Sequence, residues 1–183
     1  MRITLNQLKR IIKEEIEKDD AEEWARLAAR REQSLDLEKQ ARESTSPKEL
    51  DRLAHSEFAQ VHWFVARNPH TSGETLRYLG TTGDLGIKKQ VALNPSTPPD
   101  LLASFVDTLD GDNLLAVAGN PSTPPEALEV IFNRSKGTGP KNKGRDSNAL
   151  RALARNPSTP DEIKSWLRSS RIPWMGDAFA RKI

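Results

Sequence analysis

The chain of 183 residues contains no cysteine. Without thiols it cannot form a disulfide, a thiolate metal site or a cysteine-bound iron–sulfur cluster. The sequence also has no apolar run near the length of about 18 residues that a membrane-spanning helix needs. Its first residues lead into a charged segment rather than a signal-peptide core. We therefore expect a cytoplasmic or virion protein that makes no membrane contact and is not secreted by a signal peptide.

The residue types on which most enzyme chemistry depends are few in this sequence, or they lack the spacing of known catalytic and metal-binding motifs. The three histidines, His55, His62 and His70, show no metal-ligand spacing. Neither a phosphate-binding glycine-rich loop nor a nucleophile elbow is present. The paired acids near the N-terminus lie in a charged helical pattern, which is typical of a solvated face. The sequence accordingly predicts no catalytic residue, no metal, no cofactor and no enzyme activity.

One short pattern recurs along the chain. The tetrapeptide Asn-Pro-x-Thr occurs four times, and its asparagines are Asn68, Asn94, Asn120 and Asn156. The spacings are 26, 26 and 36 residues, so the last repeat contains about ten inserted residues. A partial copy begins at Ser46. Repetition at this period is the signature of a stacked repeat architecture.

Each repeat carries signals for starting a helix. A serine or threonine stands three residues before an acid in every copy, as in Thr97 and Asp100. We expect the hydroxyl to cap the first turn and the acid to lie near the positive helix end. Proline follows at Pro47, Pro98, Pro124 and Pro160, where its fixed φ suits the first helical position. The threonines are therefore predicted to be N-caps.

Each repeat also carries a signal for stopping a helix. A residue that precedes proline is pushed away from the α region, so the helix before each asparagine should end there. Two roles remain open for the four asparagines: helix capping and turn formation, or a ladder that recognises a ligand. The neighbouring proline favours the first.

These signals predict an all-α fold, a short α-solenoid of about four to five two-helix repeats with an N-terminal helical extension. Residues 1–43 form a charged amphipathic arm, in which one helix runs to about Glu17 and a second from about Ala21 to Arg42. Residues 44–169 form the repeats, with a basic insertion at 135–146. Residues 170–183 form a tail or cap.

The pattern Val-Ala-x-Asn-Pro-x-Thr-Pro-x-Glu-x-Leu resembles the variant leucine-rich repeats of bacterial proteins, which are related in shape to HEAT and armadillo solenoids. That resemblance covers about residues 45–168 and implies the right-handed superhelix and a binding role. The first sixteen residues also resemble the amphipathic start of proteins from large tailed bacteriophages. This second resemblance implies a component of a large assembly.

We expect the protein to act as a protein-interaction module or structural scaffold. The arm has an apolar face, and tryptophan is enriched where interfaces bind most tightly. The candidate partner-binding residues are Leu8, Ile12, Ile16, Trp24 and Trp174. Trp63 and Trp166 lie within repeats and are expected in the core. An acidic middle and a basic C-terminal end also permit head-to-tail contact between copies.

Nucleic-acid binding is the alternative function. The insertion and the C-terminal region are rich in basic residues, which can pair with phosphates. The candidates in the insertion are Lys136, Lys141, Lys143 and Arg145. A solenoid that follows a phosphate backbone should repeat such residues in register, yet the position before each asparagine reads Arg67, Leu93, Gly119 and Arg155. The sequence therefore favours a protein partner.

Overall fold

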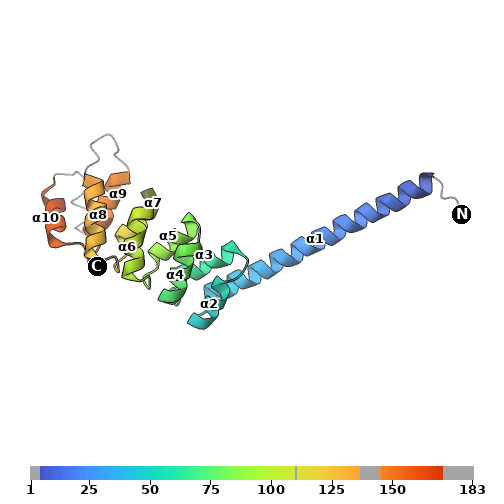
Figure 1. Cartoon of the computed structure of the whole chain (residues 1–183), viewed down its shortest axis with the longest axis horizontal. Coiled ribbons are helices and arrows are strands. Elements are labelled where there is room, and N and C mark those ends of the chain that lie inside the picture. Colours follow the sequence, from blue (N-terminus) through green and yellow to red (C-terminus); the bar gives the residue numbers. More distant parts are fainter. Residues whose placement is uncertain (1–4, 110, 137–144, 171–183) are drawn as a thin grey trace.

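The computed structural model describes residues 5–109, 111–136 and 145–170, and it has an elongated, helical form (Figure 1). These residues contain ten helices and no strand, which confirms the all-α prediction. The helices are α1 (Leu5–Glu43), α2 (Pro47–Ala54), α3 (Ala59–Arg67), α4 (Gly73–Thr82), α5 (Leu85–Leu93), α6 (Pro99–Thr108), α7 (Gly111–Gly119), α8 (Pro125–Lys136), α9 (Arg145–Arg155) and α10 (Asp161–Ser169).

The helices stack in two layers. The odd-numbered layer consists of the C-terminal end of α1 followed by α3, α5, α7 and α9, each packed on the next. The even-numbered layer, α2, α4, α6, α8 and α10, covers one side of it. Successive odd–even pairs form five repeats in the described residues, so the predicted short solenoid is confirmed.

The core runs along the stack between the two layers. Each odd helix from α3 to α9 contributes a β-branched or leucine side chain just before an alanine, and the even helices contribute leucine, isoleucine and phenylalanine. The alanines are small enough to let neighbouring helices approach closely. The fully buried members of the odd layer are Ala41, Val61, Val65, Ala66, Val91, Ala92, Val117, Ala118 and Leu153.

A buried asparagine joins each repeat to the one before it. The amide of Asn94 donates two hydrogen bonds, to the carbonyl oxygens of Ala66 and Asn68, both at 2.8 Å. Its Oδ1 accepts from the backbone N–H of Ser96 at 2.9 Å, which closes the local turn. The same bonds are repeated one period later from Asn120 to Ala92 and Asn94, and across the insertion from Asn156 to Ala118 and Asn120. These bonds form a ladder parallel to the stack axis.

The insertion leaves this ladder intact. Asn156 lies 36 residues after Asn120 rather than 26, yet both of its inter-repeat hydrogen bonds measure 2.8 Å. The extra residues fall between the end of α8 and the start of α9. The last repeat therefore stacks like the others despite its longer sequence.

The threonines of the motif do not cap the following helices, so that prediction is wrong. The hydroxyl of Thr97 donates to the carbonyl of Val91 at the end of the preceding helix, at 2.5 Å. The N-cap of α4 is Ser72, one residue after Thr71, and Pro98 and Pro160 occupy the N-cap positions of α6 and α10. Capping by a side chain is confirmed at Ser46, whose hydroxyl accepts from the N–H of Glu49. The motif threonines are buried and tie down the preceding helix.

Helix α1 is a single helix of 39 residues, where two helices were expected. The residues between Glu17 and Ala21 are Lys18, Asp19 and Asp20, and none of them is a proline or glycine that would break the helix. Its N-terminal part projects away from the stack (Figure 1). One side of its last turns packs against the stack, where Ala41 is fully buried and Asn68 donates to the carbonyls of Ala41 and Ser44.

The ladder predicts a large and specific loss of stability on substitution. Asn94→Ala removes both inter-repeat bonds from a buried site and should lower the free energy of unfolding by about 2–4 kcal/mol. Ser96→Ala removes one exposed bond to Pro69 in the same turn and should cost less than about 1 kcal/mol. Urea denaturation followed by circular dichroism checks both values. Equal losses in the two variants would show that the inter-repeat hydrogen bonds of Asn94 stabilise the fold no more than one exposed hydrogen bond does.

Candidate interaction surfaces

His55 and His62 have partners within the fold, and no metal-binding cluster forms around them among the described residues. No group of three or more histidine, aspartate or glutamate side chains that could hold a metal occurs among them. His55 stacks on Tyr78 with ring centroids 4.2 Å apart, and its Nδ1 lies 2.9 Å from the carbonyl oxygen of Asp51. His62 lies 2.7 Å from the carbonyl of Ser56 through Nε2. Both rings thus have partners within the fold.

The asparagine ladder does not present a free recognition surface. Asn94, Asn120 and Asn156 are each at most 3% exposed. Each uses both amide hydrogens and its carbonyl oxygen in bonds to the backbone, as described above for Asn94. Their polar groups are therefore satisfied within the stack, and of the two roles left open the described geometry supports the structural one.

The projecting part of α1 exposes apolar side chains along its length. Every described side chain from Asn6 to Gln33 is exposed, and the first contact with the stack is made by Arg30, which pairs with Glu57 at 2.9 Å. Trp24 is 72% exposed and Leu27 is 50% exposed. The side chains of Leu8, Ile12 and Ile16 lie outside the described part of the structure. Trp24 is thus the predicted arm residue that the structure places on an open surface.

Several of these residues share one stripe of the helix. Trp24, Ala28, Arg31, Leu35 and Arg42 follow one another at intervals of 4, 3, 4 and 7 residues. Positions at such intervals lie on the same face of an α-helix. Leu35 is 49% exposed, so this stripe stays uncovered up to the point where the helix enters the stack. We call these five residues the arm stripe.

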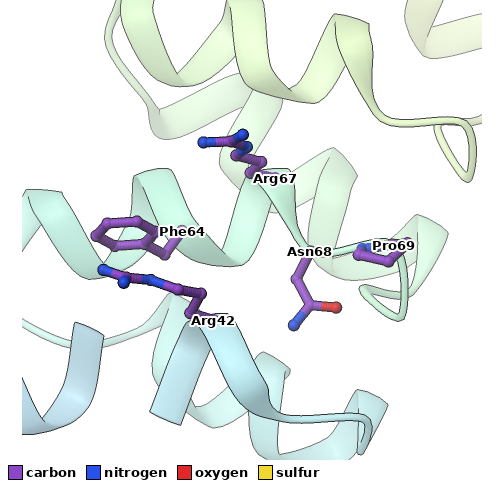
Figure 2. Close-up of a pocket in the computed structure, with 5 residues that line it drawn as sticks. All are labelled: Arg42, Phe64, Arg67, Asn68 and Pro69. Atoms are coloured by element: carbon purple, nitrogen blue, oxygen red, sulfur yellow. The ribbon is translucent and has the colours of Figure 1, made fainter. Parts of the chain in front are cut away.

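The arm stripe ends at a basic pocket that sequence reasoning missed. Arg42, Phe64, Arg67, Asn68 and Pro69 line a cavity of about 360 Å³ where α1 meets α3. The guanidinium of Arg42 lies 4.5 Å from the centroid of the Phe64 ring. In Figure 2 both guanidinium groups extend to the same side as this ring, one from each helix. Two cations and an aromatic face are thus gathered around one opening.

The arginines of this pocket have no carboxylate partner among the described residues. The guanidinium of Arg67 lies 5.3 Å from the centroid of the Trp63 ring, and neither Arg42 nor Arg67 makes an ion pair there. The neighbouring helices α3 and α5 contain no acidic residue at all. Stacking on a ring covers one face of a guanidinium and leaves its N–H edge able to bind an anion.

The even-numbered layer uses its charges differently. Arg77 of α4 pairs with Asp100 of α6 at 2.5 Å, and these hydrogen bonds hold the pKa of Asp100 below its usual value. Arg134 of α8 pairs with Asp107 of α6 at 2.8 Å. Charges in this layer therefore join neighbouring repeats, whereas those of the pocket are available to another molecule.

The residues predicted near the C-terminus are only partly described. Lys136 ends α8, is exposed, and has its Nζ 5.0 Å from the centroid of the Phe132 ring. Lys141, Lys143 and Trp174 lie outside the described residues, and Arg145 begins α9 with its side chain outside them. The side chains of three of the four basic candidates therefore lie outside the described part of the structure.

The two tryptophans expected in the core do not belong to it. Trp166 is 40% exposed and meets the edge of Phe132, with ring centroids 5.0 Å apart. Trp63 is half-buried and lies perpendicular to Phe64 at the same centroid distance. Their rings cover the outside of the core, whose interior is filled mainly by leucine, valine and alanine together with isoleucine and phenylalanine.

Comparison with known proteins returned no match. Neither a family model, nor a curated protein, nor a solved structure matches the chain significantly. In the part of the chain that is described, no helix is both long and apolar enough to cross a membrane.

The pocket predicts a contrast between stability and binding residues. Arg42→Gln and Arg67→Gln each remove a cation–π contact from an exposed side chain, so each should lower the free energy of unfolding by at most about 1 kcal/mol. Asn68→Ala in the same pocket should cost several times more, because Asn68 forms the first step of the ladder. Urea denaturation of the three variants tests this order. A large loss of unfolding free energy in either arginine variant would mean that the arginine stabilises the fold and is not held free for binding.

Proposed function

We propose that the protein is a non-enzymatic interaction or scaffold component, in which the arm of α1 binds a partner protein and the solenoid holds that arm. The observation that carries this proposal is the long exposed helix with Trp24 and Leu27 on its surface. Large exposed apolar side chains on a helix are what an interaction face requires. An isolated helix also gains little from its own hydrogen bonds in water, so a partner would stabilise it.

The connection between arm and stack supports the same function. Because α1 is continuous to Glu43, the arm leaves the stack as one rigid rod and not through a flexible linker. Such a rod fixes the direction of a bound partner relative to the solenoid. On the resemblance of residues 1–16 to the start of tailed-phage proteins, we extend the proposal to a place in a virion or another large assembly.

Removal of the exposed part of the arm tests this proposal. Deletion of residues 1–29 keeps Arg30, its pair with Glu57, and the buried end of α1. Tagged full-length and shortened chains should be expressed in the cells or particles that contain the protein, cross-linked and purified. We expect one or more specific proteins with the full chain, a strong reduction in Trp24→Glu, and loss in the shortened chain. Equal recovery from all three would contradict a role of the arm.

Nucleic-acid binding through the insertion remains the second proposal, and it makes a different prediction. It requires affinity for DNA or RNA that falls steeply with salt and weakens when Lys136, Lys141, Lys143 and Arg145 are changed to alanine. Deletion of residues 1–29 should leave that affinity unchanged. Fluorescence anisotropy with labelled single-stranded and double-stranded oligonucleotides at low salt distinguishes the two proposals.

A further inference from the structure

We propose that the arm of α1 binds the basic pocket of a second copy of the chain, so that two copies form an antiparallel dimer. This inference rests on the proposed function of the arm and names one partner for it. The acidic part of each arm would lie against Arg42, Phe64 and Arg67 of the other copy. The contact would occur twice, once on each side of a two-fold axis.

The arm carries the charge that the pocket lacks. Residues 14–23 contain seven acidic side chains and a single basic one, Lys18, and they precede Trp24 directly. On the side of Trp24, Asp20 makes no ion pair within the described residues, and Glu17 makes only an exposed one, with Lys13 at 3.7 Å. The pocket in turn holds two guanidinium groups that make no ion pair among the described residues, and the adjacent helices α3 and α5 have no acid. Opposite charges of this kind select the partner and its orientation.

The arm cannot reach the pocket of its own copy. Glu17 and Arg42 belong to one continuous helix and are separated by 25 residues. At the rise of an α-helix this places them about 37 Å apart. The acids of one arm are therefore held away from the arginines at its other end, and only a second molecule can bring the two together.

An antiparallel arrangement aligns apolar residues along with the charges. Trp24 lies seven residues after Glu17, and Leu35 lies seven residues before Arg42. When Glu17 of one arm stands opposite Arg42 of the other, Trp24 therefore stands opposite Leu35. All four are on or beside the arm stripe, because seven residues correspond to about two helical turns. The pairing covers a 72% exposed tryptophan and a 49% exposed leucine on each copy.

A parallel pairing is disfavoured by the same charges. It would place the two acidic segments 14–23 against each other, and like charges at such distances repel. In the antiparallel form the arginine of the arm stripe nearest the axis is Arg31, whose guanidinium is already 3.5 Å from Glu38 of its own helix. Arg30, which is nearer the axis but outside the stripe, pairs with Glu57. The two-fold axis therefore does not bring two unpaired arginines together.

Sedimentation equilibrium of the purified full chain tests the dimer. We expect a concentration-dependent mass that approaches twice the 20.5 kDa of one chain. Glu17→Lys with Asp20→Lys, and separately Arg42→Glu with Arg67→Glu, should each weaken the dimer by about tenfold or more. An equimolar mixture of these two variants should restore much of the affinity, because both contacts of the mixed dimer pair opposite charges: one is the original contact and the other has its charges exchanged.

A matched control separates this contact from net charge. Glu15→Lys with Glu22→Lys makes the same charge change in the same helix segment, but positions 15 and 22 lie on the face opposite Trp24. This control should change the dissociation constant by less than about twofold, as expected for charges outside a contact. Circular dichroism of each variant verifies that the helix is retained. A control that weakens the dimer as much as the test variants would overturn the proposed face.

Disulfide trapping tests the register. The chain has no cysteine, so Trp24→Cys with Leu35→Cys introduces the only two thiols. Within one helix these positions are about 16 Å apart, too far for a disulfide, which requires Cα atoms within about 7 Å. Mild oxidation should therefore give a covalent dimer. Trp24→Cys with Gln33→Cys, which faces the other side, should give much less.

Three results would overturn the inference. They are a monomer at all accessible concentrations, species larger than a dimer, and equal disulfide trapping in the two cysteine variants. If the purified chain is monomeric while the arm still recovers another protein from its source, the inference fails and the proposed function stands. If neither the dimer nor an arm-dependent partner is found, both fail.

Discussion

The carboxamide of one asparagine per repeat holds successive repeats in position, and the rest of the molecule depends on it. A primary amide offers two donors and an acceptor, and each ladder asparagine uses all of them on backbone groups. The acceptor closes the turn that follows, while the donors reach two carbonyls of the preceding repeat. One side chain thus sets the local turn, the distance between repeats and their direction of stacking. A hydrophobic contact has no directional preference and could not fix all three.

Much of the fold followed from the sequence because helix signals are local. The residue before proline cannot continue a helix, and the 26-residue spacing of Asn68, Asn94 and Asn120 shows that units repeat. These facts were enough to predict stacked helix pairs and a structural role for the asparagines. The bonding partners of the asparagines were not predictable in the same way, because Ala66 and Asn68 contact Asn94 only after the repeats have stacked.

Two features were predicted wrongly or missed because they depend on contacts that form only in the folded stack. Thr97 matches a capping pattern with Asp100, but its hydroxyl is buried and donates to the carbonyl of Val91 in the preceding helix. Charge counted along the chain gave an acidic middle and a basic end, whereas in the stack Arg42 and Arg67 are gathered from two helices. The signal that could have revealed the pocket is the arginine next to the first ladder asparagine, together with the adjacent Trp63 and Phe64. Its partner Arg42 lies outside the recognisable repeats.

The continuity of α1 has a mechanical consequence. The carbonyl oxygens of Ala41 and Ser44, at the base of the arm, accept the amide of Asn68. A pull on the arm is therefore transmitted along an unbroken helix to the first hydrogen bonds of the stack. Because each repeat contacts mainly its neighbours, rupture at that point would expose the next step of the ladder and let the solenoid unravel from one end. The N-terminal repeat is thus the site at which an external force would enter the fold.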